Sequence, residues 1–95
     1  MPKNKLVAPE QESFIQGRNA LLERINHGDI SIGEAIRTMR ELLGMTQTEY
    51  GDKVAKVSRK ALSQLENNQG DPRLSTINRC CKAFGLEAGL VQKRL

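Results

Sequence analysis

Hydrophobic residues recur at helical spacing along most of this chain, and polar residues or glycines interrupt the pattern between runs. The clearest stripe extends from Ile32 to Leu43, where apolar side chains return every three or four positions. Ser31 precedes the stripe and Glu34 follows three positions later, a spacing typical of a capping box at a helix start. Gly44 predicts the end of this helix.

Two further helix starts lie about a dozen residues apart within the segment from Thr46 to Asn68. Thr46 and Glu49 form a second capping-box pattern, and Ser58 opens the next apolar run. The apolar positions are Tyr50 and Val54 in the first run and Ala61, Leu62 and Leu65 in the second. The pattern predicts two short helices joined by a tight turn, an arrangement found in DNA-reading helix-turn-helix proteins.

A longer apolar pattern precedes this group. Pro9 suits the first turn of a helix, Gly28 predicts its end, and residues 1–8 are expected to form a loose arm. The apolar face needs a partner, which is either the rest of the domain or a second subunit. The residues on that face are Phe14, Ile15, Leu21, Leu22 and Ile25.

A last helix is predicted after a loop rich in Asn, Gly and Pro at residues 67–72, and Gly85 terminates it. Its apolar face is formed by Leu74, Ile77, Cys81 and Phe84. The tail that follows, LEAGLVQKRL, has a different pattern, which predicts a short strand. Because an isolated strand is not stable, we expect this strand to pair with a partner.

The bulk properties suit one small helical domain. The chain has 95 residues, of which 38% are hydrophobic and 3% aromatic, with no Trp, which argues against a large ligand pocket. A core of this size is marginal, so dimerisation would help it. The net charge of +4 is compatible with nucleic acid or another anionic partner, and equally with ordinary solubility charge.

The two cysteines and the absence of targeting signals bear on the cellular compartment of the protein. Cys80 and Cys81 are adjacent, which matches none of the usual zinc or redox spacings, so we interpret them as reduced structural thiols. The sequence shows no signal peptide and no apolar run long enough to span a membrane. A cytoplasmic protein is therefore expected.

From Ser31 to Phe84 the sequence resembles the lambda-repressor-like, Xre-type helix-turn-helix family. The segments that carry the resemblance are RELLGMTQTE (40–49), VSRKALSQLENN (57–68) and DPRLSTINRCCKAFGL (71–86), in the family's order. The resemblance implies an all-α helix-turn-helix bundle, here with an extra N-terminal helix. Two departures stand out: Tyr50-Gly51 replaces the usual Leu-Ala, and the turn VAKVS is one residue longer, with Lys56 where Gly is usual.

The chain's ending also resembles HipB-type antitoxins, in which a short C-terminal strand pairs across a dimer. The resemblance rests on LSTINRCCKAFGLEAGLV and implies a homodimer interface at Leu86, Ala88, Leu90 and Val91. The chain then divides into an N-terminal arm and helix (1–28), a helix-turn-helix DNA-binding domain (29–86) and a C-terminal dimerisation strand (87–95). Other Xre-type regulators carry extra C-terminal segments as well.

The family motif implies which residues meet DNA. Arginine can pair with guanine and glutamine with adenine through two hydrogen bonds in the major groove, which is entered by the N-terminal turn of a recognition helix. The expected base contacts are Arg59, Lys60, Ser63 and Gln64. The expected phosphate contacts are Gln47, Lys53, Lys56, Ser58, Asn67 and Asn68. Arg40 and Glu66 are expected to form a structural ion pair.

These features predict a dimeric, sequence-specific repressor that binds a palindromic operator and, as an antitoxin with a kinase-like toxin as partner, regulates its own operon. One alternative is a phage or standalone Xre-type regulator without a toxin, and another is a module that only binds proteins. An RNA-binding role is disfavoured by the few aromatic residues. No catalytic residue, metal or cofactor is expected, since the only histidine, His27, has no nucleophile partner or metal motif nearby in the sequence.

Overall fold

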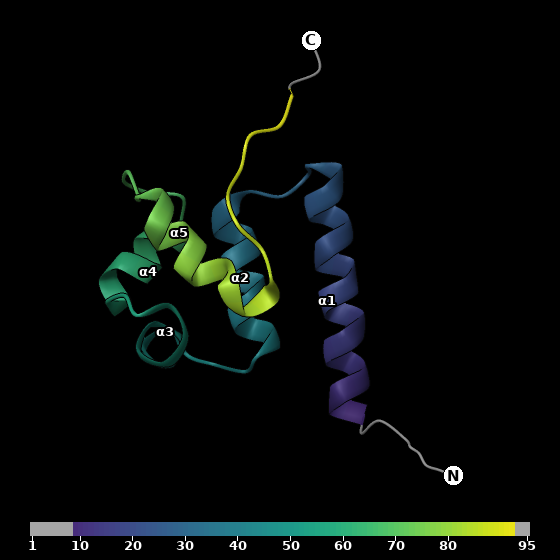
Figure 1. Cartoon of the computed structure of the whole chain (residues 1–95). Helices are drawn as coiled ribbons and strands as arrows, with labels where there is room; N and C mark the ends of the chain where they lie inside the picture. Colours follow the sequence, from purple (N-terminus) through teal and green to yellow (C-terminus); the bar gives the residue numbers. More distant parts are fainter. Residues whose placement is uncertain (1–8, 93–95) are drawn as a thin grey trace.

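The computed structural model describes residues 9–92, and helices joined by short loops account for most of this range (Figure 1). The elements are α1 (Pro9–His27), α2 (Ile32–Leu42), α3 (Gln47–Tyr50), the π-helical segment η1 (Gly51–Ala55), α4 (Arg59–Glu66), α5 (Leu74–Cys81) and the 3₁₀ turn η2 (Lys82–Phe84). No strand occurs within residues 9–92, so the predicted all-α class is confirmed for this part of the chain. The arm expected at residues 1–8 lies outside the described residues.

Side-chain caps begin the three central helices at the predicted residues. Ser31 accepts a hydrogen bond from the amide of Glu34, at 3.1 Å, and Ser58 caps α4 in the same way. Thr46 and Glu49 form the complete, reciprocal capping box. The predicted box at Ser31 is only half formed, because the Glu34 carboxylate pairs with Arg24 of α1 instead.

The hydrophobic core lies where α2, α4 and α5 meet. Its most deeply buried side chains are Ile36, Met39, Tyr50, Leu62 and Cys80. Tyr50, which replaces the usual leucine, is completely buried, and its hydroxyl donates a hydrogen bond to the Cys80 carbonyl. Burial raises the pKa of the Cys80 thiol to about 11, so this cysteine stays protonated and serves as a packing residue at neutral pH.

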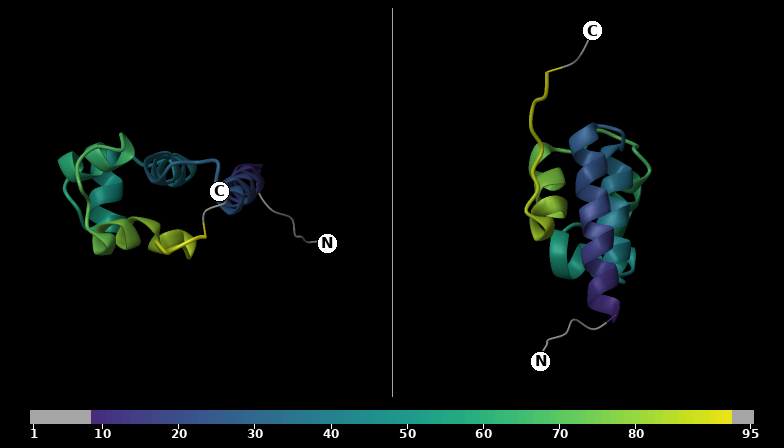
Figure 2. Two further views of the ribbon diagram at one scale, coloured as in Figure 1. Left: turned by 90° about the horizontal axis from the view of Figure 1, so that it is seen from above. Right: turned by 90° about the vertical axis from the view of Figure 1, so that its right-hand side faces the viewer.

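Helix α1 packs on the same chain, where α2 lies between α1 and α4, and α5 with η2 lies beside α2 (Figure 2). Leu21 is buried, and the rings of Phe14 and Phe84 lie 5.9 Å apart, joining α1 to η2. Gly17 permits the close approach, since a Cβ there would lie 2.4 Å from Leu42 Cδ2. The domain itself therefore covers the inner face of α1.

Four residues of the predicted apolar faces are exposed instead of buried. Ile32 and Leu74 are 51% and 68% exposed, because each is the first residue of its helix, where the neighbouring helices do not cover it. Ile15 lies on the outer side of α1, and Leu43 caps the C-terminal end of α2. The helical period was predicted correctly, but it does not show how far the neighbouring helices extend.

The tail does not form the predicted strand in the single chain. Leu86 and Ala88 pack against their own core, and the Ala88 amide donates to the side chain of Asn78 at 2.8 Å. Leu90 and Val91 are fully exposed. A strand is defined by backbone hydrogen bonds to a neighbouring strand, and residues 9–92 of one chain contain no strand with which this segment could pair. Residues 93–95 of the predicted strand lie outside the described part.

Candidate nucleic-acid interface

Helices α3 and α4 form the helix-turn-helix pair, and the π-helical segment η1 accommodates the extra residue between them. The carbonyl of Gly51 accepts hydrogen bonds from the amides of Lys56 and Val57, which closes a widened final turn. A Cβ at position 51 would lie 2.5 Å from the Val57 carbonyl oxygen. Glycine replaces the usual alanine because the backbone on both sides of the turn approaches too closely for a side chain.

Lys56 holds the position at which the family usually has glycine, and its backbone is left-handed, with φ of 57°. This conformation costs a non-glycine residue about 1–2 kcal/mol. Its ammonium group donates a hydrogen bond to the Asp52 carbonyl at 3.0 Å, so the charge is directed back onto η1. Lys56 is therefore a strained turn residue as well as an expected phosphate contact.

The recognition helix α4 has one buried side and one exposed side. Leu62 and Leu65 are buried in the core. Among the expected base contacts, Arg59, Lys60 and Gln64 are exposed and Ser63 is half-buried. Within residues 9–92, no hydrogen bond or ion pair engages the side chains of Arg59, Lys60 or Gln64, so their donors are free to meet the edges of bases.

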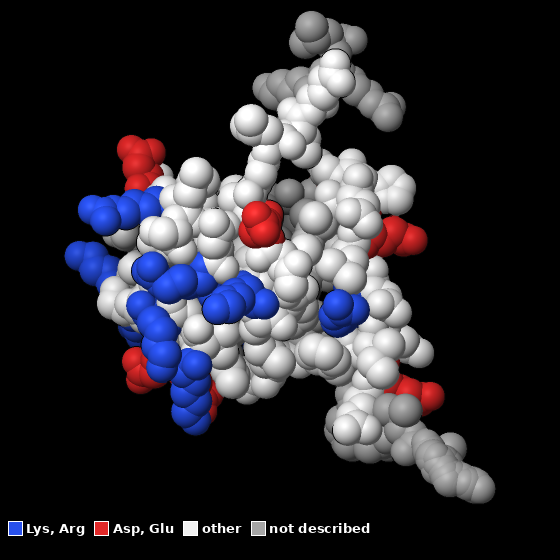
Figure 3. Space-filling view, viewed as in Figure 1, with Lys and Arg blue, Asp and Glu red and all other residues white. Residues whose placement is uncertain are grey.

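Basic side chains gather on the half of the molecule formed by α3, α4 and α5, whereas α1 carries mixed charges (Figure 3). Arg79 is anchored there by a hydrogen bond to the Ala55 carbonyl at 3.1 Å. Such a surface attracts the phosphates of nucleic acid without regard to sequence. The exposed basic residues of this half are Lys53, Lys56, Arg59, Lys60, Arg73, Arg79 and Lys82.

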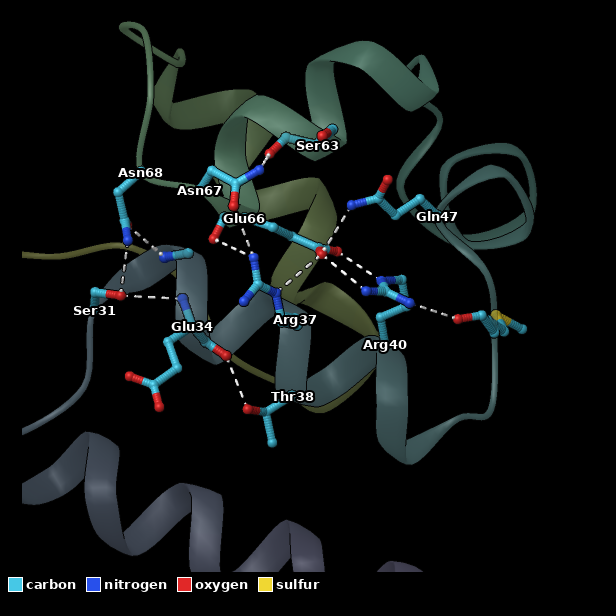
Figure 4. A network of polar contacts seen from close by, with 12 residues as sticks. Ser31, Glu34, Arg37, Thr38, Arg40, Gln47, Ser63, Glu66, Asn67 and Asn68 are labelled. Atoms are coloured by element: carbon cyan, nitrogen blue, oxygen red, sulfur yellow. Dashed lines mark hydrogen bonds and ion pairs between the residues drawn. The ribbon is translucent and has the colours of Figure 1, made fainter.

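A polar network centred on Glu66 fixes the inner side of α4 to α2 and α3 (Figure 4). The Glu66 side chain is completely buried, and Arg40 binds it with Nε 2.7 Å from Oε2 and a second nitrogen 3.0 Å from Oε1. Gln47 donates to Oε1 at 3.1 Å, and Arg37 Nε lies 3.5 Å from the same oxygen. The expected ion pair is thus present, and it forms part of a larger network.

Burial by itself would raise the pKa of Glu66. The hydrogen bonds from Arg40 and Gln47, together with the charge of Arg40, outweigh burial and lower this pKa, so the carboxylate stays ionised. The expected phosphate contact Gln47 is half-buried, and its side-chain amide donates one hydrogen bond to Glu66. Its remaining donor and its position at the start of α3 stay compatible with a phosphate contact.

Three other expected phosphate contacts use their side chains within the fold. Asn67 donates to the Ser63 carbonyl and accepts from Arg37, and Asn68 accepts from the amide of Gly33. Ser58 caps α4. Sequence reasoning missed Arg37 and Gly33, because their role depends on contacts 29 and more residues away in the chain. Contact between these polar residues and DNA phosphates stays a prediction.

The fold and the exposed basic face define a DNA-binding transcription regulator. The sequence model of the helix-turn-helix family matches residues 36–91, more than half of the chain, and the chain belongs to this Xre-type helix-turn-helix family. No match is found among curated proteins or among solved structures. Helix α1 lies outside the matched residues.

Membrane-spanning helices and metal-binding clusters are both absent from the part of the chain that the structure describes. No helix there is both long enough and apolar enough to cross a membrane. No group of three or more His, Cys, Asp or Glu side chains within residues 11–92 is placed to hold a metal ion.

Proposed function

We propose that the protein is a homodimeric, sequence-specific repressor that binds a palindromic operator. The observation that carries the proposal is the two-sided construction of α4. Its inner side is fixed by the buried Glu66 network, while Arg59, Lys60 and Gln64 on the outer side are exposed and free of partners within the described residues. Rigid support beneath free base-reading side chains is what major-groove recognition requires.

Dimerisation provides a second helix-turn-helix, which binds the second half-site of the operator. One helix-turn-helix covers one half-site, and a two-fold dimer reads two half-sites about one helical turn apart. Leu90 and Val91 support a tail-mediated dimer, since both are apolar and fully exposed in the single chain. Pairing of the two tails as an antiparallel ribbon would bury these side chains and satisfy the backbone of residues 89–92.

A narrower proposal makes the repressor a HipB-type antitoxin that binds a kinase-like toxin and regulates its own operon in the cytoplasm. Its support is the resemblance of residues 74–91 to those antitoxins. The protein would act by binding alone, without catalysis. The test is to coexpress the chain with the product of the neighbouring gene: neutralisation of a kinase-like toxin supports this role, and a neighbour of another kind supports a standalone regulator.

The DNA-binding proposal is tested by selecting ligands from a pool of random duplexes with the full-length protein and measuring affinity at several salt concentrations. We expect one palindromic sequence to emerge and to bind at least about 10³-fold more tightly than unselected duplex at physiological salt. Affinity for both duplexes should fall as salt rises. Equal affinity for all duplexes would overturn sequence-specific repression, and no affinity at all would favour a protein-interaction module.

A further inference from the structure

The loop that follows the recognition helix is attached to the start of α2 through the side chain of Asn68. Its Oδ1 accepts a hydrogen bond from the amide of Gly33 at 3.0 Å, and its Nδ2 donates to the hydroxyl of Ser31 at 3.2 Å. Ser31 in turn accepts from the amide of Glu34. Two amides of the first turn of α2 are therefore capped, one by Ser31 and the other by a residue 35 positions away in the sequence.

The backbones of the two helices are in close contact at this point. A Cβ on Gly33 would lie 2.5 Å from the Leu65 carbonyl oxygen and 2.8 Å from that of Glu66. The first turn of α2, with its partial positive charge, thus faces the last carbonyls of α4, with their partial negative charge. Arg37 adds a hydrogen bond to the Glu66 carbonyl at 3.3 Å.

The residue type at position 68 fits this task. Asn68 has a left-handed backbone, with φ of 56°, a conformation that glycine adopts freely and asparagine tolerates better than most residues. Glycine would satisfy the backbone but has no side chain to cap α2. Asparagine satisfies both requirements, because it accepts the left-handed conformation and also presents an acceptor and a donor to α2.

We infer that Asn68 is a positioning residue for DNA recognition, which fixes the angle at which α4 presents its base-reading side chains. The inference rests on the proposed DNA-binding function. Helix α4 has eight residues and is about 12 Å long, so a small rotation at its C-terminal end moves Arg59 at the other end. The Glu66 network holds the inner side of the helix, and the Asn68–Gly33 bond provides a second attachment that prevents the helix from pivoting about the first.

The test compares two substitutions at this position in the full chain. Asn68→Gly keeps the left-handed backbone and removes the cap. Asn68→Asp keeps the acceptor for Gly33. The first readout is the specificity ratio, defined as the dissociation constant for unselected duplex divided by that for the selected duplex, measured below the unfolding transition of every variant. The second readout is hydrogen exchange of the Gly33 amide in the free protein.

We expect Asn68→Gly to lower the specificity ratio about tenfold, as expected when one bidentate base contact is misaligned, and to accelerate exchange at Gly33. Asn68→Asp should retain both the ratio and the protection, although its negative charge will weaken binding to all DNA. Phe14→Ala, at the α1–η2 contact far from the recognition helix, is the matched control for lost stability. It should leave the specificity ratio unchanged.

Three results would overturn the positioning role. An unchanged ratio in Asn68→Gly with accelerated exchange at Gly33 would show a purely structural cap. An equal loss of affinity for both duplexes would make Asn68 a phosphate contact instead. A loss of specificity in Phe14→Ala as large as in Asn68→Gly would assign the effect to general destabilisation. A wild-type chain without sequence preference would refute the proposed function itself. That outcome can be told apart from the three above, because the specificity ratio of the wild-type chain would already equal one.

Discussion

Arg40 and Glu66 form a two-point contact beneath the recognition helix, with guanidinium nitrogens 2.7 and 3.0 Å from the two carboxylate oxygens. The contact spans 26 residues of sequence and joins α2 to α4. The Arg40 side chain is 16% exposed and the Glu66 side chain is completely buried. Because either charge would be left without its partner in a poorly solvated site, the two residues should behave as a unit.

The first prediction concerns this pair. Arg40→Ala and Glu66→Ala should each lower the free energy of unfolding by about 3–5 kcal/mol, and the double substitution should cost much less than their sum. Denaturant titrations of the four proteins measure the coupling. Arg37→Ala is the comparison, since this side chain is 41% exposed and its ion-pair contact to Glu66 is longer, at 3.5 Å. This substitution should cost less than Arg40→Ala, although it also removes hydrogen bonds to the Glu66 carbonyl and to Asn67. A coupling energy near zero would mean that the contact does not stabilise the fold.

The second prediction concerns acid stability. The pKa of Glu66 is lowered in the folded state, so this group binds its proton more weakly when folded than when unfolded. Its stabilisation is therefore fully present above the unfolded value of about 4.3 and is lost as the pH falls through the lower folded value. Unfolding free energies measured from pH 7 to pH 3 should decline steeply below about pH 4.5.

Glu66→Gln isolates this contribution, because glutamine keeps the shape and cannot titrate. The variant should be less stable at pH 7 and show a smaller decline toward pH 3. The pKa of Glu49 is lowered as well, by hydrogen bonds to the backbone and side chain of Thr46, and this effect will remain in the variant. Parallel pH profiles for wild type and Glu66→Gln would show that Glu66 does not contribute to acid unfolding.

Local sequence patterns predicted most of the helices and few of the contacts between them. The helix starts at Ser31, Thr46 and Ser58 could be predicted, because a cap depends on residues three positions apart. The partners of Gly33 and Asn68 could not, because the two residues meet only after α2 and α4 have packed. The tail is a third case, since its pattern predicted a strand, and residues 86–92 form none in the described chain.

The third prediction is that two substitutions in the same turn have opposite effects on stability. Lys56→Gly should raise the free energy of unfolding by about 0.5–1 kcal/mol, because relief of the left-handed strain exceeds the added backbone entropy. Gly51→Ala should lower it by about 1–3 kcal/mol, although alanine is the better helix former, because the new Cβ would clash with the Val57 carbonyl. Thermal and denaturant unfolding measure both. Stabilisation by Gly51→Ala would contradict the close approach at η1.

The fourth prediction separates base contacts from phosphate contacts. Arg59→Ala and Gln64→Ala should each weaken binding to the selected duplex by about 1–3 kcal/mol. Gln64→Ala should leave binding to unselected duplex nearly unchanged. Lys53→Ala should weaken both duplexes by a similar factor and reduce the salt slope by about one. Titrations at several salt concentrations provide the comparison. The same specificity ratio for Arg59→Ala and Lys53→Ala would show that Arg59 does not read bases.

The last prediction concerns the dimer, and the structure shows where to cut the tail. Ala88 donates its amide to Asn78 and packs on its own domain, so a deletion should begin after it. Removal of residues 89–95 takes away Leu90 and Val91, which contribute exposed apolar surface and little to the core. In sedimentation experiments, the shortened chain should be monomeric at concentrations where the full chain is dimeric. Its helical circular dichroism should persist while operator affinity falls.

A full-length control distinguishes loss of the apolar side chains from loss of chain length. Leu90→Ser combined with Val91→Ser keeps the backbone able to pair and removes the apolar surface, so it should weaken the dimer without abolishing it at high concentration. A deletion variant that remains a tight dimer would refute the tail interface. The exposed Leu74 at the start of α5, Ile32 at the start of α2 and Ile15 on the outer side of α1 would then be the first positions to substitute, since they are further exposed apolar side chains available to a second chain.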